Sequence, residues 1–320
     1  MTESLRARIR DTLSALCLLL VASSPAFALA EELPWPERDP ERLRLASVQA
    51  AVARLDGADG EYLFTRQADR TVPIASVTKL MTALVVRESG AELEEWLEIV
   101  PRDFEIDKNT FTHLRVGSEL RRRDLMRIML QASENMAAHT LASHHPGGRI
   151  GFIEAMNATA ARLGMTGTRF AGPSGLQPRN VSTAADLVRL ARAAWADPVI
   201  REYSTGGYFA ARFRNPRYSL NYGNTNPLIH SSSWDVQLSK TGYLDESGRC
   251  LVMVAELDGE PLVFVLLDSF GRRSPLGDAG RVRRWLQTGD SGGVAAAAAD
   301  HVRRREAEYA TRERAESAGS

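Results

Sequence analysis

The sequence predicts an α+β domain in which the two ends of the chain pair into one antiparallel sheet, with a mostly helical block between them. Short apolar runs at 47–55 and 61–65 flank the turn Asp-Gly-Ala-Asp-Gly and predict an N-terminal hairpin. Four further runs, separated by turn residues, predict strands in the C-terminal part, at 207–213, 236–241, 249–257 and 262–267.

Helices are predicted for the middle of the chain, where apolar residues recur at three- and four-residue spacing. These segments are 76–87, 123–130, 134–143, 149–163 and 183–196. The last of them is expected to be capped by Ser182 and to stop at Pro198. One more helix is expected near 277–286.

Two segments flank the domain predicted for residues 46–288. Residues 31–45 contain three prolines and many charges, so we expect an exposed lead-in. Residues 289–320 form a polar tail rich in Ala, Arg and Glu, which we expect to be disordered or a frayed helix. Its weak apolar face argues against anchoring in a membrane.

The first 30 residues have the pattern of a secretory signal. Three arginines within the first ten residues precede an apolar run at 13–22, and small residues follow, with cleavage expected after Ala28 or Ala30. The apolar run is shorter than the roughly 20 residues that a spanning helix needs. We therefore expect a periplasmic protein of a Gram-negative-type envelope without a stable membrane anchor.

The number and positions of the cysteines indicate a fold that is stabilised by its hydrophobic core and not by disulfides. The chain has two cysteines, Cys17 within the predicted signal and Cys250, so the mature chain has no partner for an intramolecular disulfide. Cys250 lies in a predicted strand and is expected to be buried.

The charged residues argue against binding driven by net charge, and among them lysine is rare. The chain has 40 basic and 40 acidic residues, so its net charge attracts neither nucleic acid nor an anionic membrane. Lysine occurs only at Lys79, Lys108 and Lys240, and the other 37 basic residues are arginine. A lysine can lose its proton when buried, which arginine cannot do.

Ser76 and Lys79 begin a predicted helix in the sequence Ser-Val-Thr-Lys. Positions three apart lie on one face of a helix, so the hydroxyl and the amine come within hydrogen-bonding reach. A neutral lysine could take the serine proton and make the hydroxyl a nucleophile. Two more motifs follow in order: Ser133-Glu134-Asn135 between two predicted helices, and Lys240-Thr241-Gly242 at the end of a predicted strand.

This set of three motifs is typical of serine acyl transferases that act on D-Ala-D-Ala peptides or β-lactams. Over residues 46–286 the sequence resembles the low-molecular-weight penicillin-binding proteins, and within them the D-alanyl-D-alanine endopeptidase group. The resemblance is carried by PIASVTKLMTALVV (73–86), SENMAAHTLASHHPGG (133–148), FIEAMNATAARLGMTGTRFAGPSGL (152–176), NVSTAADL (180–187) and KTGYLDESGRCLVM (240–253). It implies the penicillin-binding or β-lactamase-like transpeptidase fold and a serine peptidase that uses no cofactor.

The resemblance also implies a role for each motif residue. Ser76 would attack a D-Ala carbonyl with Lys79 as its base, and Ser133 would relay a proton to the leaving amine. Substrate would be bound by Asn135, Lys240, Thr241 and Gly242, with Gly242 letting the substrate backbone approach the strand. The oxyanion hole would consist of the backbone N–H groups of Ser76 and Tyr243. The implied partners are cross-linked peptidoglycan peptides as substrates and β-lactam antibiotics as inhibitors.

Several alternatives remain open at this point. A DD-carboxypeptidase would use the same residues to remove a terminal D-Ala, and a non-catalytic sensor of β-lactams or peptidoglycan would keep the cleft without turnover. A β-lactamase needs a carboxylate to activate the deacylating water. The candidate carboxylates between the second and third motifs lie in no recognisable context of that kind: Glu154, Asp186, Asp197, Glu202 and Asp235.

Two other groups of residues invite a functional reading. His139, His144 and His145 lack the spacing of a zinc peptidase, so we expect no metal site. The aromatic, Arg-rich stretch 208–222 could form a rim that meets a wall strand, with its arginines binding peptide carboxylates, or it could be ordinary connection. Lys108, outside all three motifs, is expected to be a surface residue.

Overall fold

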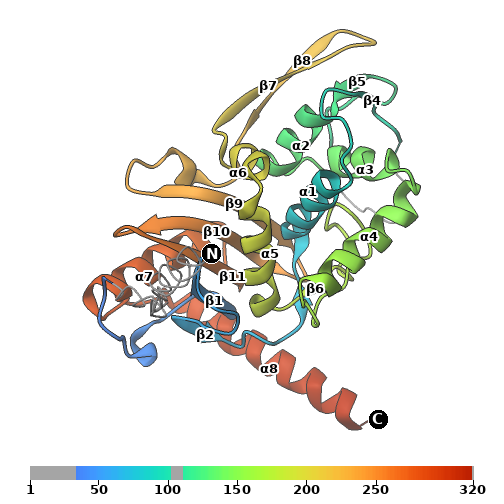
Figure 1. The fold of residues 1–320 in the computed structure, drawn as a ribbon. Helices are drawn as coiled ribbons and strands as arrows, with labels where there is room; N and C mark the ends of the chain where they lie inside the picture. Colours follow the sequence, from blue (N-terminus) through green and yellow to red (C-terminus); the bar gives the residue numbers. More distant parts are fainter. Residues whose placement is uncertain (1–33, 102–110, 319–320) are drawn as a thin grey trace, which may run out of the picture. The chain divides into compact units, whose positions relative to one another are not determined.

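A five-stranded antiparallel sheet joins the two ends of the chain in the computed structural model, which describes residues 34–101 and 111–318 (Figure 1). The strand order is β2-β1-β11-β10-β9. The strands are β1 (Gln49–Arg54), β2 (Phe64–Arg66), β9 (Asp235–Leu244), β10 (Gly248–Leu257) and β11 (Glu260–Ser269). The predicted α+β fold is confirmed, whereas the predicted signal and Lys108 lie outside the described residues.

The N-terminal strand is inserted beside the last strand of the chain. β1 pairs with β11 in antiparallel register, with Val52 opposite Phe264. Most residues of β10 and β11 are buried, as expected for strands covered on both faces. Helix α5 (Ala184–Ala196) covers one face of the sheet, and α7 (Ser274–Thr288) packs on β10 and β11 from the other (Figure 1).

The helical block supplies the rest of the core. It consists of the 3-10 turn η2 (Ala75–Thr78) and the helices α1 (Lys79–Glu88), α2 (Arg122–Gln131), α3 (Asn135–Ser143), α4 (Gly148–Arg162), α5 and α6 (Pro198–Thr205). The predicted helix at 76–87 therefore begins as a 3-10 turn. Every residue of α1 from Lys79 to Val86 is buried, because α2, α3, α4, α5 and α6 all contact it.

The cap of α5 differs from the prediction, and the helix that follows α5 was not predicted. Thr183 rather than Ser182 caps α5, because the Thr183 hydroxyl accepts the Asp186 N–H at 3.0 Å. The predicted stop at Pro198 is confirmed, since α5 ends at Ala196, and Pro198 also occupies the first turn of α6. Asp197 caps α6 by accepting the N–H groups of Val199 and Ile200 at 2.8 and 3.1 Å.

Three short two-stranded pairs lie outside the main sheet. They are β3 (Val72–Pro73) with β6 (Val181–Ser182), β4 (Trp96–Glu98) with β5 (Glu119–Arg121), and β7 (Tyr208–Phe213) with β8 (Tyr218–Gly223). The strand predicted at 207–213 therefore belongs to a separate hairpin. Two further 3-10 turns are η1 (Pro40–Arg42) and η3 (Pro227–His230).

The lead-in predicted to be exposed is partly buried, which corrects that expectation. Trp35 and Leu43 are only 6% and 2% exposed. The Trp35 indole N–H donates to Asp258 Oδ2 at 2.7 Å, and Arg38 Nε donates to the Leu286 carbonyl at 2.7 Å. The charged residues between Trp35 and Leu43 remain at the surface. The composition of the segment therefore does not reveal that these two apolar side chains are buried.

The polar tail contains the helix α8 (Ala296–Ala318), which contacts β11. Tyr309 is buried, and its hydroxyl donates to the buried Asp268 carboxylate at 2.9 Å. In residues 34–101 and 111–318 no helix is long and apolar enough to cross a membrane.

Candidate active site

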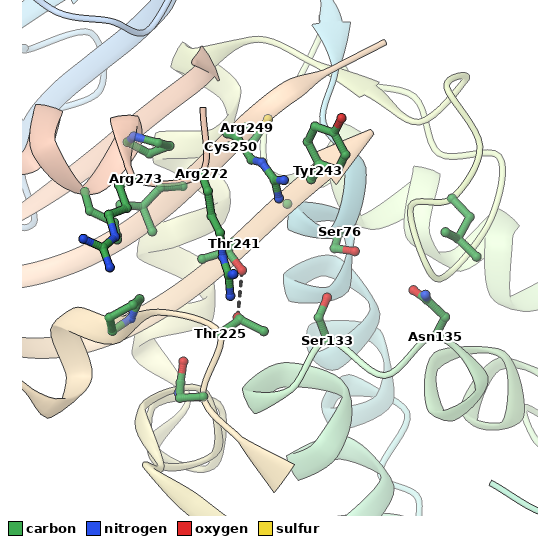
Figure 2. Close-up of a pocket in the computed structure, with 17 residues that line it drawn as sticks. Ser76, Ser133, Asn135, Thr225, Thr241, Tyr243, Arg249, Cys250, Arg272 and Arg273 are labelled. Atoms are coloured by element: carbon green, nitrogen blue, oxygen red, sulfur yellow. Dashed lines mark hydrogen bonds between the residues drawn. The ribbon is translucent and has the colours of Figure 1, made fainter. Parts of the chain in front are cut away.

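A cleft of about 740 Å³ brings the three sequence motifs together (Figure 2). Ser76 comes from η2, Ser133 from the connection between α2 and α3, Asn135 from the start of α3, and Thr241 and Gly242 from β9. The remaining lining residues are Leu176, Asn224, Thr225, Pro227, Tyr243, Arg249, Cys250, Leu251, Arg272, Arg273, Pro275 and Leu276. Figure 2 shows the polar ends of Ser76, Ser133 and Asn135 facing one shared space.

Lys79 lies directly behind Ser76, one helical turn further along the chain. Its side chain is fully buried, and its Nζ donates to Ser76 Oγ at 2.9 Å, Asn135 Oδ1 at 2.7 Å and the Ser174 carbonyl at 2.5 Å. Asn135 is thus held against the lysine as well as facing the cleft. The first two motifs form one hydrogen-bonded unit.

Ser174 is a site residue that the sequence reasoning missed. Its backbone carbonyl contacts Lys79, and the neighbouring Pro173 carbonyl accepts from Thr82 Oγ1 at 2.6 Å. Gly175 follows with φ +80°, and a Cβ there would lie 1.9 Å from the Ala75 carbonyl oxygen. The Pro-Ser-Gly sequence of the 152–176 block was the available signal, since a conformation and an approach of this kind require glycine.

Ser133 occupies an unusual backbone conformation at the tip of the second motif. Its φ is +63°, a region that costs a non-glycine residue about 1–3 kcal/mol. The next residue, Glu134, caps α3 by accepting the Met136 N–H at 3.0 Å. The cap starts the helix at Asn135, so the two polar side chains project from a fixed turn.

The third motif lies within β9 rather than at its end, because the strand continues to Leu244. Lys240 is 1% exposed, its Nζ donates to the Thr241 carbonyl at 2.9 Å, and burial lowers the pKa of its ammonium to about 7. Thr241 and Gly242 line the cleft, whereas Lys240 does not contribute to the lining. Lys240 thus lies beneath the exposed edge of the site.

Gly242 allows close packing against the backbone of η2. A Cβ at this position would lie 3.0 Å from the Ile74 carbonyl and 3.1 Å from the Ser76 nitrogen. The absence of a side chain is therefore explained by the approach of η2. That Gly242 lets the substrate backbone approach the strand stays a prediction.

Tyr243 extends the same edge of the cleft. Because β9 is the edge strand of the sheet, part of its backbone faces away from β10. The Tyr243 side chain is half exposed, its hydroxyl donates to Asp245 Oδ1 at 2.6 Å, and the Arg249 guanidinium lies 3.6 Å from the ring centre. These contacts involve the side chain, so the backbone N–H assigned to the oxyanion hole is independent of them.

The far wall of the cleft is basic, which the sequence reasoning did not anticipate. Arg272 and Arg273 lie there, on the side of Thr241 away from Ser76, and Arg249 lies beside Tyr243 (Figure 2). Arg272 and Arg273 precede α7 in a segment with no motif of its own, so only the tertiary fold brings them to the site.

The three histidines of the helical block contact backbone instead of one another. His139 Nε2 lies 3.0 Å from the Pro101 carbonyl oxygen, and His144 Nε2 lies 2.9 Å from that of Glu98. Over the part of the chain that the structure describes, no group of three potential ligands could hold a metal ion.

A serine hydroxyl bonded to a buried lysine, in a cleft that also presents a second serine and an asparagine, defines a site for serine acyl transfer. Residues 40–271 match the family model described as D-alanyl-D-alanine carboxypeptidase. The chain belongs to this family of serine peptidases, as the resemblance predicted.

Similar proteins span the chain. It is 42% identical to a D-alanyl-D-alanine endopeptidase of Pseudomonas aeruginosa over 91% of this chain and 93% of that protein. It is 38% identical to a D-alanyl-D-alanine endopeptidase of Escherichia coli, over 95% and 96%. A crystal structure of a Streptomyces DD-transpeptidase superposes with a TM-score of 0.68 at 28% identity, covering 74% of this chain and 95% of that one.

A second solved structure carries a bound antibiotic. Penicillin-binding protein D2 of Listeria monocytogenes in its ampicillin-bound form superposes with a TM-score of 0.64 at 31% identity. The match covers 74% of this chain and 96% of that one.

Proposed function

We propose that the protein is a serine DD-endopeptidase that hydrolyses D-Ala-diaminopimelate cross-links of peptidoglycan through a Ser76 acyl-enzyme. One geometric observation carries this proposal: the 2.9 Å contact between Ser76 Oγ and the buried Lys79 Nζ, at the point where the three motifs meet. Two D-alanyl-D-alanine endopeptidases that match over more than nine tenths of both chains support the choice of reaction.

The hydrogen bonds of Lys79 support a role as the base. A neutral amine has two N–H groups and one lone pair. The Asn135 Oδ1 and Ser174 carbonyl oxygens can accept the two N–H groups, which directs the lone pair to the Ser76 hydroxyl. Lys79 takes the hydroxyl proton while Ser76 Oγ bonds to the D-Ala carbonyl carbon, and the backbone N–H groups of Ser76 and Tyr243 stabilise the resulting oxyanion.

Collapse of this intermediate breaks the peptide bond. The leaving amine receives a proton through Ser133, and water then hydrolyses the Ser76 ester to release the D-Ala carboxylate. Asn135, Thr241 and Gly242 border the substrate, and Lys240 below them supplies positive charge when it is protonated. The cleft-lining residues that the structure describes include no Asp or Glu, which favours a peptidase over a β-lactamase.

The DD-carboxypeptidase reaction is the second candidate, favoured by the description of the family model and by relatives of that name. One of them, from Streptomyces, is 28% identical over 84% of its length. The same groups would release a terminal D-Ala. Cleavage of the predicted signal would place either activity in the periplasm.

Product analysis of the purified protein tests the proposal. We expect cross-linked muropeptide dimers to yield monomers, and Ser76→Ala to abolish the product. Release of D-Ala from uncross-linked pentapeptides alone would make the protein a carboxypeptidase. No product from either substrate, with penicillin still bound at Ser76, would indicate a sensor.

A further inference from the structure

A second hollow, of about 500 Å³, lies at the outer end of the β7–β8 hairpin. It is lined by Trp96, Arg212, Phe213, Arg214, Arg217, Tyr218 and Ser219. Figure 1 shows the hairpin projecting away from the central sheet. None of these residues lines the catalytic cleft.

The hollow is held in place by packing against the β4–β5 pair. The backbones of Arg214 and Glu119 exchange two hydrogen bonds of 2.9 and 3.1 Å, and their side chains form an ion pair. The Arg214 guanidinium lies 4.2 Å from the centre of the Trp96 ring. Phe213 and Tyr218 stack with ring centres 4.3 Å apart. The hairpin tip is thus a fixed surface.

This surface has more positive than negative charge, although the chain as a whole is neutral. Arg212 and Arg217 are exposed, and neither forms an ion pair or a side-chain hydrogen bond with any residue of 34–101 or 111–318. Glu119 is already paired with Arg214. Two guanidinium groups at the mouth of the hollow remain available to carboxylates.

The hairpin leads directly into the catalytic cleft. β8 ends at Gly223, and the next two residues, Asn224 and Thr225, line the cleft. Thr225 Oγ1 accepts a 2.7 Å hydrogen bond from Thr241 Oγ1 of the third motif (Figure 2). The six residues of β8 span about 20 Å at the rise of an extended strand.

We propose that the hairpin tip is a second substrate-binding site, at which Arg212 and Arg217 bind carboxylate-bearing peptides of the wall polymer remote from the bond that is cut. This proposal rests on the proposed function and deepens it. A ligand confined to the cleft does not reach a site about 20 Å along the strand, whereas a polymer that carries many acidic peptides can occupy both. The hairpin would favour polymeric over small substrates.

The test compares Arg212→Gln/Arg217→Gln with the control Arg303→Gln/Arg304→Gln, which removes two exposed arginines from α8. Each protein is assayed on insoluble peptidoglycan and on soluble muropeptide dimers. We expect the hairpin variant to lose about fivefold or more of kcat/KM on the insoluble polymer, as two exposed charge-assisted contacts would give. On dimers it should stay within about twofold of wild type, and the control should match wild type on both.

A binding assay without turnover tests the hairpin site independently of the endopeptidase activity. In a Ser76→Ala background, co-sedimentation with insoluble peptidoglycan should weaken severalfold in the hairpin variant. Raising the salt to about 0.3 M should remove most of that difference, because exposed charges are screened. Equal losses on dimers and polymer, or unchanged binding and turnover on the polymer, would each overturn the second site. Failure of wild type to cut dimers would instead overturn the endopeptidase proposal, and the sedimentation result would still report on the hairpin.

Discussion

Lys79 has surroundings that only a lysine can use for proton transfer. It is fully buried, and its amine contacts the Ser76 hydroxyl together with two oxygen acceptors from different parts of the chain. A guanidinium in the same place would keep its proton and present five N–H donors to three partners. Replacing Lys79 by arginine keeps the positive charge but removes the base. The replacement therefore distinguishes a role in proton transfer from a purely electrostatic role.

We expect Lys79→Arg to lower the rate of acylation by fluorescent penicillin by a factor on the order of 10³, within the range for loss of a general base. The rate constant is measured by stopping the reaction at intervals and quantifying the labelled protein. Ser76→Ala lacks the hydroxyl that is acylated and gives the background level of labelling. Acylation of Lys79→Arg at nearly the wild-type rate would contradict the assignment of Lys79 as the base.

The buried ammonium of Lys240 predicts how the stability of the protein depends on pH. Burial lowers its pKa from 10.5 to about 7, so between these values the unfolded chain binds a proton that the folded chain does not. Stability must then rise with pH over this window, by at most about 1.4 kcal/mol per pH unit. Below pH 7 both states are protonated, and the full cost of the buried charge remains.

Lys240→Met removes this titration. We expect the wild-type free energy of unfolding, measured by urea denaturation, to increase relative to that of the variant from pH 7.5 to pH 9.5. Parallel curves for the two proteins over this range would show that the Lys240 ammonium is not titrating there.

At the scale of elements, the sequence predicts the site better than it predicts the boundaries around it. The pairing of Ser76 with Lys79 follows from helical spacing, although those residues span a 3-10 turn and the start of α1. The contact of Asn135 with Lys79 and the supporting Ser174 carbonyl are long-range, separated by 56 and 95 residues. Local sequence patterns carry no information on such contacts. They arise because α1 packs against the other helices of the helical block.

The same limit explains the elements that were missed. β9 continues to Leu244 because β10 pairs with it that far, and α6 forms because Asp197 caps the helix that begins at Pro198. Trp35, Leu43 and Tyr309 are isolated buried residues within charged segments, so the low average hydropathy of those segments does not reveal them. For β9, Trp35 and Tyr309 a tertiary contact decides what composition left open, whereas the cap of α6 is a local contact.

Helix α8 is held to the sheet by one buried carboxylate. Asp268 accepts from Arg305 Nε at 2.7 Å and the Tyr309 hydroxyl at 2.9 Å, and His301 Nε2 lies 3.2 Å away. Arg305 also donates to the Glu246 carbonyl at 3.1 Å, in the turn between β9 and β10. The polar tail thus supports the hairpin that carries the third motif.

We expect Arg305→Ala to lower the free energy of unfolding by about 3 kcal/mol, because it leaves Asp268 buried without its cation. Arg303, exposed on the same helix, is the matched control and should change stability by less than about 0.5 kcal/mol when replaced by Ala. Urea denaturation of the two variants measures the difference. Equal, small effects would mean that the pairing of Arg305 with Asp268 adds nothing to the stability of the fold.

For the whole molecule, stability comes from packing without covalent cross-links in the described residues. Cys250 is a free, buried thiol in β10, next to the edge strand β9. It borders the cleft, yet it is only 2% exposed, and burial raises the pKa of its thiol to about 12. Since the thiolate is the reactive form, labelling of Cys250 reports on opening of the sheet.

We expect iodoacetamide at pH 8 to label the native protein at a rate lower than that of free cysteine by a factor on the order of 10³, from the smaller thiolate fraction. In concentrated urea the rate should approach that of free cysteine, because both the burial and the pKa shift are lost. Mass spectrometry of samples quenched over time gives both rates. Rapid labelling under native conditions would show that β9 and β10 separate without global unfolding, and the strand that carries Thr241 and Gly242 would then be a mobile wall of the cleft.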